Sequence, residues 1–292
     1  MAKTDLTKTI MARFDRLKTG RQNWETHWQE VADYMQPRKA DVTKTRSRGD
    51  KRTELIFDSS PIQAVELLAA SLHGMLTNPS TPWFSLRYKD QGLDADDEAK
   101  LWLEGVTETM YTAFNRSNFQ QEIFELYHDL ITFGTAAMFI EEDQSDLLKF
   151  STRHINEIYV TENDKGRIDT VYRKFKITLR AAAQQFGGGL SEEAKRRVDK
   201  DPFDEIDILH AVYPRQDFNP AKKDKQNMEF ESVYVEYKNG NELSVGGFVE
   251  FPFVVPRYLK ASHEIYGRSP AMTALPDVKM LNEMSKTTIK AA

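Results

Sequence analysis

The sequence predicts an α+β fold in which N-terminal helices pack with a small, mainly antiparallel β region, and a long helix follows. Three observations predict it. Apolar residues recur at helical spacing through residues 1–133, and short segments rich in β-forming residues fill 134–265. Helical spacing then returns and runs to Ala292. We therefore expect one α+β domain over 1–265 and a separate helical segment over 266–292.

The first element is a long amphipathic helix. Apolar residues from Leu6 to Met35 recur every three or four positions, which predicts one helix over 5–35 or two helices broken near Gly20. Pro37 ends the pattern, because proline cannot supply a backbone donor to a continuing helix.

A strongly basic segment comes next. Residues 38–54 carry seven basic and three acidic side chains with almost nothing apolar, which predicts an exposed, mobile loop. A solvated loop is the default interpretation. The alternative is contact with nucleic acid or with an acidic neighbouring subunit. The candidate contact residues are Arg38, Lys39, Lys44, Arg46, Arg48, Lys51 and Arg52.

Three further helices complete the N-terminal part. Ser59-Ser60-Pro61 predicts the start of a helix that runs to about Leu76 and buries its apolar positions, Ile62, Val65, Leu68, Leu72 and Leu76 or Met75. A turn over 77–82 and a short strand over 83–88 follow. Helices are expected over 94–116 and 118–133, with Asn118 as the cap of the second.

The β region is interrupted once by helix. We expect strands over 135–141, 148–152, 157–161, 167–176, 205–213, 230–238, 242–250 and 252–259. Asp164-Lys165-Gly166 and Asn239-Gly240 predict hairpin turns. Residues 178–199 are helical and split by Gly187-Gly188-Gly189, which we interpret as a helix end and hinge. Pro270 begins the final helix, whose pattern reaches Ala292 without a stop signal; we read the chain as part of a longer gene product.

The composition argues against several kinds of chemistry. The 292 residues carry a net charge of −5, whereas a protein that grips DNA over a broad surface is usually basic. The absence of cysteine excludes disulfides, thiolate catalysis and cysteine-ligated zinc. The six histidines are dispersed, and the glycine run lacks the Lys-Ser/Thr of a phosphate loop. We therefore predict no catalytic residue, no metal, no cofactor and no enzymatic activity.

Two acidic runs have ordinary explanations. Residues 94–98 suit the positive end of a helix dipole, and 141–143 suit a solvated loop after a strand. The alternative for the second run is a two-metal nuclease site that would use Glu141 and Glu142. The sequence shows no stretch long and apolar enough for a membrane span and no secretory signal.

Four segments, in order, resemble the head-to-tail connecting (portal) family of short-tailed phages. They are 28–37 (WQEVADYMQP); 57–60 with 69–79 and 83–84; 117–119 with 129–136; and 251–258 with 266–282. Each segment alone has low specificity, but the four together span about 260 residues. The resemblance covers nearly the whole chain and only the N-terminal half of such a family member.

The resemblance implies a structural role. Portal proteins form a ring, usually dodecameric, at one capsid vertex, where the terminase packages double-stranded DNA that is later ejected and where the tail attaches. It implies wing over 1–265 and the start of the stem helix over 266–292, with the rest of the stem, the clip and the crown outside this chain. The implied partners are copies of itself, terminase, capsid and scaffolding proteins, tail adaptor proteins and DNA, with no membrane, in a virion assembled in the host cytoplasm.

The final helix carries a stripe suited to subunit contact. Met272, Leu275, Val278 and Leu281 recur at helical spacing, so we expect them to bury against a neighbouring subunit or against the body of the chain. The alternative function is a non-enzymatic nucleic-acid-binding module, or another virion structural module, that uses the basic loop 38–54.

Overall fold

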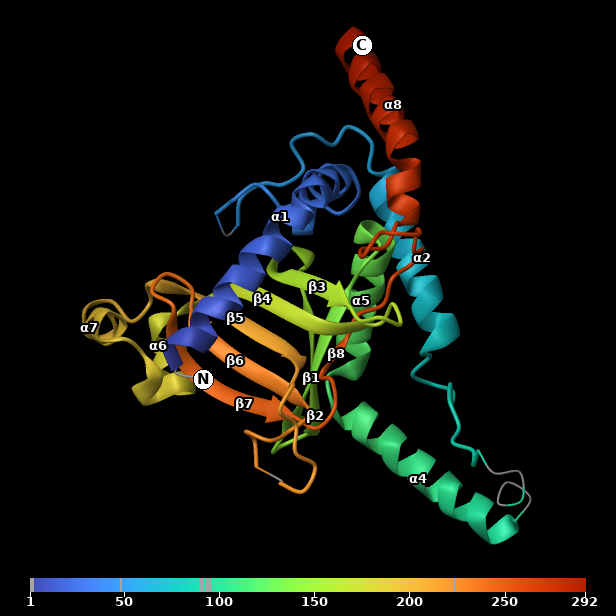
Figure 1. The fold of residues 1–292 in the computed structure, drawn as a ribbon. Helices are drawn as coiled ribbons and strands as arrows, with labels where there is room; N and C mark the ends of the chain where they lie inside the picture. Colours follow the sequence, from blue (N-terminus) through green and yellow to red (C-terminus); the bar gives the residue numbers. More distant parts are fainter. Residues whose placement is uncertain (1–2, 48, 90–91, 93–95, 223) are drawn as a thin grey trace. The chain divides into compact units, whose positions relative to one another are not determined.

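The computed structural model describes residues 3–47, 49–89, 92, 96–222 and 224–292 (Figure 1). The chain divides into two compact units, and each is discontinuous in sequence. Unit 1 holds the residues up to Thr26 and Asn156–Phe253; unit 2 holds His27–Ile155 and Val254–Ala292. The long helix α1 (Lys3–Met35) contributes to both units. The boundary expected at residue 265 concerns the wing and stem of a ring, and it stays a prediction.

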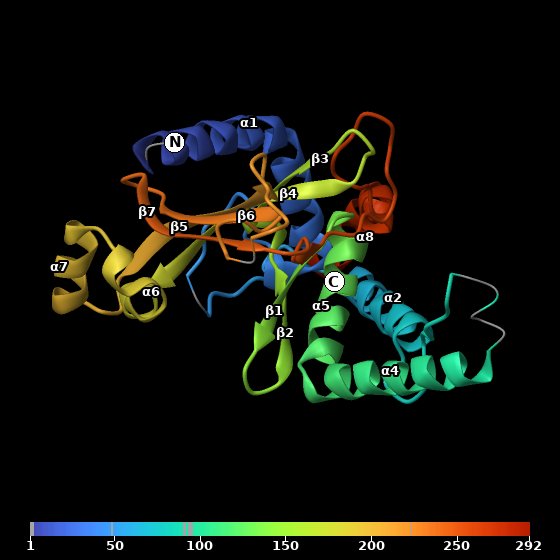
Figure 2. The same cartoon turned by 60° about the horizontal axis from the view of Figure 1, so that its bottom comes forward.

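Unit 1 is a five-stranded antiparallel sheet with helix α1 on one face (Figures 1 and 2). The strand order is β3-β4-β5-β6-β7. Ile10 and Phe14 of α1 pack against sheet residues such as Leu209, and the Phe14 ring meets the edge of Tyr159 at 4.7 Å between centroids. The strands are β3 (Ile158–Glu162), β4 (Ile168–Thr178), β5 (Glu205–Pro214), β6 (Phe230–Glu236) and β7 (Asn241–Phe248).

The predicted turns and the helical interruption of unit 1 are confirmed. Gly166 and Gly240 adopt φ of +69° and +64° in the two hairpin turns, a conformation that glycine tolerates best. Helices α6 (Leu179–Phe186) and α7 (Glu192–Lys200) flank the 3₁₀ turn η3 (Gly187–Gly189). A Cβ at Gly189 would lie 2.3 Å from the Leu243 carbonyl oxygen, so the glycine run permits close approach to β7.

Unit 2 is built around helix α5 (Phe119–Phe133), which contacts α2, α8, β1 and β2. Nine of its residues are buried, because both apolar and polar faces are covered. The other elements are η1 (Pro37–Lys39), α2 (Ser60–Leu76), α4 (Asp97–Arg116), β1 (Ala137–Asp143), β2 (Leu147–Arg153) and α8 (Pro270–Ala291). The turn η2 (Ile155–Glu157) and strand β8 (Phe253–Val254) lie where the chain passes from one unit to the other.

The outer edge of β2 is closed by side chains rather than by another strand. In the sheet of order β2-β1-β8, β2 is an edge strand. Asn118 donates to the Phe150 carbonyl at 2.8 Å and accepts from the Phe150 amide at 2.9 Å, and Glu122 accepts from the Thr152 amide at 2.6 Å. Asn118 does occupy the N-cap position of α5, but its amide serves this strand edge, which corrects its predicted role as the capping group.

Helix α1 runs unbroken through Gly20 and ends at Met35, two residues before Pro37. This confirms the prediction of one long helix rather than two helices broken near Gly20. The strand expected over 83–88 is wrong, because these residues, all of them described, form no strand. The Tyr111 hydroxyl accepts from the amides of Trp83 and Phe84, both at 2.6 Å, and takes the place of a neighbouring strand.

Two more expectations fail in part. Of the positions of α2 expected to be buried, only Val65 is buried. Ile62, Leu68 and Leu72 are half-buried, and Met75 and Leu76 at the end of the helix are exposed. The strand expected over 252–259 shrinks to Phe253–Val254. Prolines at 252 and 256 lack the backbone donor that a longer ladder would need.

Candidate functional site

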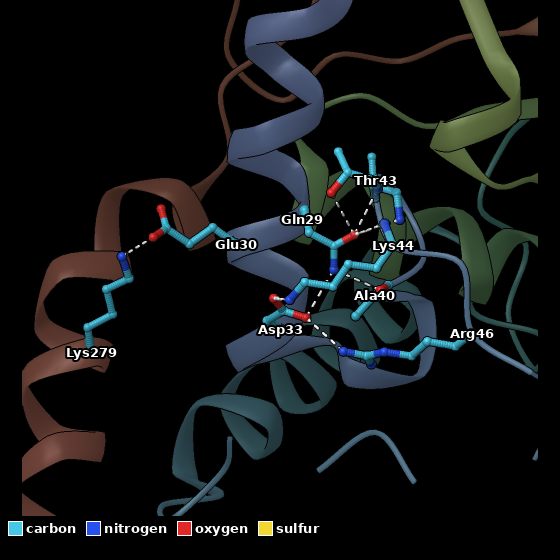
Figure 3. A network of polar contacts seen from close by, with 9 residues as sticks. Gln29, Glu30, Asp33, Ala40, Thr43, Lys44, Arg46 and Lys279 are labelled. Carbon is cyan, nitrogen blue, oxygen red and sulfur yellow. Dashed lines mark hydrogen bonds and ion pairs between the residues drawn. The ribbon is translucent and has the colours of Figure 1, made fainter. Parts of the chain in front are cut away.

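The basic segment, residues 38–54, is fastened to the end of α1 by a buried glutamine (Figure 3). Gln29 Oε1 accepts hydrogen bonds from the amides of Val42 at 2.9 Å and Thr43 at 2.8 Å. Its Nε2 donates to the Ala40 carbonyl at 2.7 Å. One side chain therefore satisfies several backbone groups of a segment that has no regular structure after η1.

Asp33, one turn after Gln29, binds two of the predicted basic residues (Figure 3). Its carboxylate pairs with Lys44 Nζ at 2.5 Å and with Arg46 at 3.4 Å, and it accepts from Gln29 Nε2 at 3.0 Å. Because the Asp33 side chain is only 9% exposed, these cations compensate a charge that is largely withdrawn from water.

Helix α5 binds the start of the basic segment. Arg38 pairs with Glu125 at 2.8 Å, and Lys39 reaches both Glu125 at 3.0 Å and the buried Asp129 at 2.6 Å. Burial pushes the pKa of Glu125 upward, but the hydrogen bonds and charges of Arg38 and Lys39 outweigh it and hold the pKa below its ordinary value. Arg52 pairs with Asp41 and donates to the Arg38 carbonyl at 3.0 Å.

The described residues of the basic segment are mostly exposed, as predicted, but the segment makes several contacts with the rest of unit 2, and its mobility stays a prediction. The candidates with ion pairs inside unit 2 are Arg38, Lys39, Lys44, Arg46 and Arg52; Lys51 is exposed, and Arg48 lies outside the described residues. The charges of the pairs differ in exposure. The Arg38 and Lys44 side chains are about half exposed, whereas the carboxylates of Asp33 and Asp129 are nearly covered. The most exposed groups of these pairs are therefore cationic.

A cavity of about 300 Å³ lies under the basic segment, lined by Arg38 and Arg52 and by the apolar side chains of Ile62 and Val65. Gln36 and His128 also line it. Both amide atoms of Gln36 and Nδ1 of His128 are buried and have no hydrogen-bond partner among the described residues. Burial lowers the pKa of His128, with a further contribution from Arg38.

Helix α4 presents an unusual surface. None of its twenty residues, all of them described, is buried. Leu101 and Trp102 are 70% and 62% exposed. On its inner side the helix meets an aromatic cluster, in which Phe84 stacks on Tyr111 at 4.4 Å and Trp83 stacks on Phe119 at 5.8 Å. The cluster holds one face of α4 and leaves the other face open.

Helix α8 is anchored at its start. Ser269 Oγ accepts from the Met272 amide and donates to the Thr132 carbonyl, both at 2.9 Å. Beside it, the backbones of Gly134 and Gly267 approach so closely that a Cβ on either residue would lie 2.3 Å from the carbonyl oxygen of the other. The geometry fixes the point at which α8 leaves the unit.

The four predicted contact residues of α8 divide into two groups. Met272 and Leu275 are buried within the chain, Val278 is half-buried, and Leu281 is 39% exposed. Farther along the helix, Met280, Met284 and Ile289 are exposed.

Helix α8 also has a polar attachment that sequence reasoning missed. Asn282 accepts from the Phe57 amide at 2.7 Å and donates to the Leu55 carbonyl at 2.8 Å, and Lys279 pairs with Glu30 (Figure 3). The sequence did contain a signal for this attachment: Asn282 is a polar residue on the buried stripe of α8, seven positions after Leu275.

Residues of the two acidic runs have structural roles, whereas Glu142 of the alternative nuclease site is exposed. Glu141 pairs across the β1–β2 hairpin with Lys149 at 3.1 Å, and Asp143 accepts from the Ser145 amide in the turn. Asp96 caps α4, as expected for the acidic run at its start. Within the described residues, no group of three or more potential ligand side chains is arranged to hold a metal ion. No helix in that same part of the chain is both long and apolar enough to cross a bilayer.

The features described above are a charged segment fixed to a helical unit, an exposed helix and an anchored helix. A family model of bacteriophage head to tail connecting proteins matches residues 7–292. The chain belongs to that family, which confirms the resemblance drawn from its sequence.

The chain is also similar to proteins that are named as portal proteins. The chain is 33% identical over 286 residues to a probable portal protein of Bordetella phage BPP-1, and 31% identical over 292 residues to a portal protein of Salmonella phage epsilon15. A portal protein of Enterobacteria phage T3 is 20% identical over 293 residues. The matches cover 96%, 98% and 96% of this chain. The chain spans about half the length of these relatives, 52%, 52% and 51%.

Proposed function

We propose that this chain is a structural subunit of a phage portal, which assembles with copies of itself into a ring at one capsid vertex. The observation that carries the proposal is the family match over 7–292, together with relatives named as portal proteins at 31–33% identity. In this role the ring, of about twelve subunits by resemblance, lets the terminase package double-stranded DNA, lets the DNA leave later, and receives the tail.

The proposal also includes other proteins that contact the ring and its location in the virion. Capsid and scaffolding proteins surround the ring, tail adaptor proteins bind it, and the assembled particle carries it as a virion component built in the host cytoplasm. The chain has no enzymatic activity of its own in this role. In this role its surfaces perform the function, and Glu141 of the alternative nuclease site pairs with Lys149 in the β1–β2 hairpin.

The second half of α8 supports a contact between neighbouring copies. The helix is anchored at Ser269 and extends away from the rest of unit 2 (Figure 1). Its exposed methionines, Met280 and Met284, follow one another by one turn, and Leu281 lies beside them. Of the contact residues predicted from sequence, Leu281 suits an intermolecular contact, whereas Met272 and Leu275 already pack within their own chain. Burial of these apolar side chains between copies would favour assembly.

Measuring the native mass of the chain tests the proposed function directly. We expect the chain to form closed rings of about a dozen subunits, measured by mass photometry and imaged by negative stain. Met280→Glu with Met284→Glu should lower the ring fraction, because charged side chains would then enter an apolar contact. Glu192→Lys with Glu193→Lys, on the exposed helix α7, serves as the control for a change in charge. A chain that stays monomeric in all conditions would contradict the proposed function.

A nucleic-acid-binding module built on the basic segment is the competing function. Such a site needs cations that are free to neutralise phosphates. The ion pairs of Arg38, Lys39 and Lys44 with carboxylates of their own unit work against it.

A further inference from the structure

We propose that a pocket beside helix α4 binds the arginine side chain of a partner protein, with the guanidinium group held by aromatic rings and two carboxylates. We call it the α4 pocket. All of its lining residues belong to unit 2, so the site can be tested whether or not the chain forms rings.

The α4 pocket has a volume of about 460 Å³ and lies between α4 and the chain that follows α2. Residues 78–86 line one side of it, and Gln120 of α5 also contributes. The α4 residues of the lining recur at helical spacing and therefore share one face of the helix. They are Glu104, Thr107, Glu108, Tyr111, Phe114 and Asn115.

Four aromatic rings line the pocket: those of Trp83, Phe84, Tyr111 and Phe114. Phe84 and Tyr111 stack at 4.4 Å between ring centroids, and Trp83 and Phe114 lie 6.0 Å apart. All four residues are half-buried, so part of each ring remains open to a bound group. The face of an aromatic ring is electron-rich and attracts a cation placed over it.

The charge of the pocket is negative. Its two charged lining residues, Glu104 and Glu108, are both acidic and lie one helical turn apart. Both are exposed, and neither carboxylate has an ion pair within the described part of the chain. Lys100 and Arg116, the basic residues of α4, do not line the pocket. Two like charges at this spacing repel each other, so a bound cation would relieve the repulsion.

Gln120 adds a third acceptor. Its Oε1 is buried and has no hydrogen-bond partner among the described residues. The Tyr111 hydroxyl, in contrast, is engaged, since it accepts from two backbone amides and donates to the Phe84 carbonyl at 2.8 Å. The unused groups at Glu104, Glu108 and Gln120 are acceptors, so the ligand that suits them is a hydrogen-bond donor.

Arginine fits these features better than lysine does. The guanidinium group is planar, stacks on aromatic faces and presents several N–H donors at once, whereas the lysine ammonium is a strongly hydrated point charge. Residues 79–82 at the rim of the pocket are exposed, so the site suits a side chain presented by another protein better than an enclosed small ligand. Arginine is also enriched among the residues that dominate binding between proteins.

Titration with blocked peptides tests the ligand. The probe Gly-Gly-Arg-Gly-Gly is compared with peptides that carry lysine, leucine or citrulline at the centre, because citrulline has the shape of arginine without its charge. Tryptophan fluorescence of the full chain reports binding through Trp83, and Trp83→Phe should remove the response. We expect the arginine peptide to bind about tenfold more tightly than the citrulline peptide, and more tightly than the other two.

Variants of the lining test the site. Glu104→Gln with Glu108→Gln should weaken binding of the arginine peptide about tenfold, because both negative charges are lost while side-chain size is kept. Asp97→Asn with Glu98→Gln, the matched control, removes two charges from the same helix outside the pocket and should leave the affinity close to that of the unchanged chain. Phe84→Leu should also weaken binding of the arginine peptide. Circular dichroism and thermal melting check that each variant is folded.

The outcomes separate the α4 pocket from the proposed function. A preference for arginine that is lost in the Glu104 and Glu108 variant and kept in the control supports the site. Equal binding of the lysine, leucine or citrulline peptide, or no response to the arginine peptide up to about 10 mM, would overturn it. A chain that forms no rings would contradict the portal role and leave this test unaffected.

Discussion

At the scale of single residues, primary amides organise the irregular parts of unit 2. Gln29, Asn118 and Asn282 each use the carbonyl oxygen to accept from backbone N–H groups and the NH₂ group to donate to a backbone carbonyl. An amide side chain presents the same donor and acceptor pair as a peptide group. It can therefore take the place of a neighbouring strand for a segment that has none.

Gln29→Ala tests this role. The change removes the bonds to Ala40, Val42 and Thr43 and leaves partly buried backbone groups unpaired, so we expect the free energy of unfolding to fall by about 2 kcal/mol. Urea denaturation followed by circular dichroism measures it. Gln22→Ala, an exposed glutamine of the same helix, is the matched control and should change stability by less than about 0.5 kcal/mol. Equal effects at the two positions would contradict the anchoring role of Gln29.

At the scale of elements, helix α8 is positioned by backbone approach as much as by side-chain packing. Gly134 ends α5 with φ of +75°, and its backbone touches that of Gly267 just before α8 begins. Thr135 adds a hydrogen bond from the Gly267 amide at 2.7 Å. The start of α8 is therefore set by two glycines that are far apart in the sequence.

Glycine substitutions distinguish this contact from ordinary helix glycines. Gly134→Ala should lower the free energy of unfolding by about 3 kcal/mol, because an L-residue is strained at this φ and its Cβ would collide with the Gly267 carbonyl. Gly20→Ala, inside α1 where a Cβ meets no described atom within 4 Å, should raise stability by about 0.5–1 kcal/mol. Thermal melting of both variants measures the contrast, and a stable Gly134→Ala protein would refute the close approach.

At the scale of the whole molecule, the net charge is negative and the concentrated basic segment is largely paired with carboxylates. The chain has a net charge of −5, and its one concentrated basic segment is bound to carboxylates such as Asp33, Glu125 and Asp129. Binding to DNA over a broad surface needs many free cations that neutralise phosphates, and this charge distribution provides few. The Arg38 and Lys44 side chains of the same segment stay about half exposed.

Weak binding to DNA is a measurable consequence of this charge distribution. We expect the chain to bind a fluorescent double-stranded DNA oligonucleotide more weakly than about 10⁻⁴ M at 150 mM salt, the weak end of non-specific binding. Fluorescence anisotropy over a salt series gives both affinity and slope. Micromolar binding with a steep loss of affinity on adding salt, abolished by Arg38→Glu with Lys51→Glu, would favour the nucleic-acid-binding alternative instead.

The sequence by itself determined the order and type of most elements. Helical periodicity placed α1 and α5, and glycine in two-residue and three-residue turns placed the hairpins at Gly166 and Gly240, because these signals depend on neighbours along the chain. The ordered motifs from Trp28 to Asn282 indicated the family. Local signals also misled. Residues 83–88 have the composition of a strand, but the Tyr111 hydroxyl, rather than a neighbouring strand, accepts the hydrogen bonds of Trp83 and Phe84.

The tertiary structure decided what the charged and apolar candidates contact. From the sequence, water was the default surrounding of the cations of the basic segment, with DNA or a neighbour as the alternative. Their partners Glu125 and Asp129 lie about ninety positions away, so the sequence did not indicate them. The same holds for α8, where helical spacing placed Met272 and Leu281 on one stripe, but only packing showed which of them the chain itself covers. Periodicity reports which face of a helix is apolar, whereas the identity of the covering surface depends on contacts between distant residues.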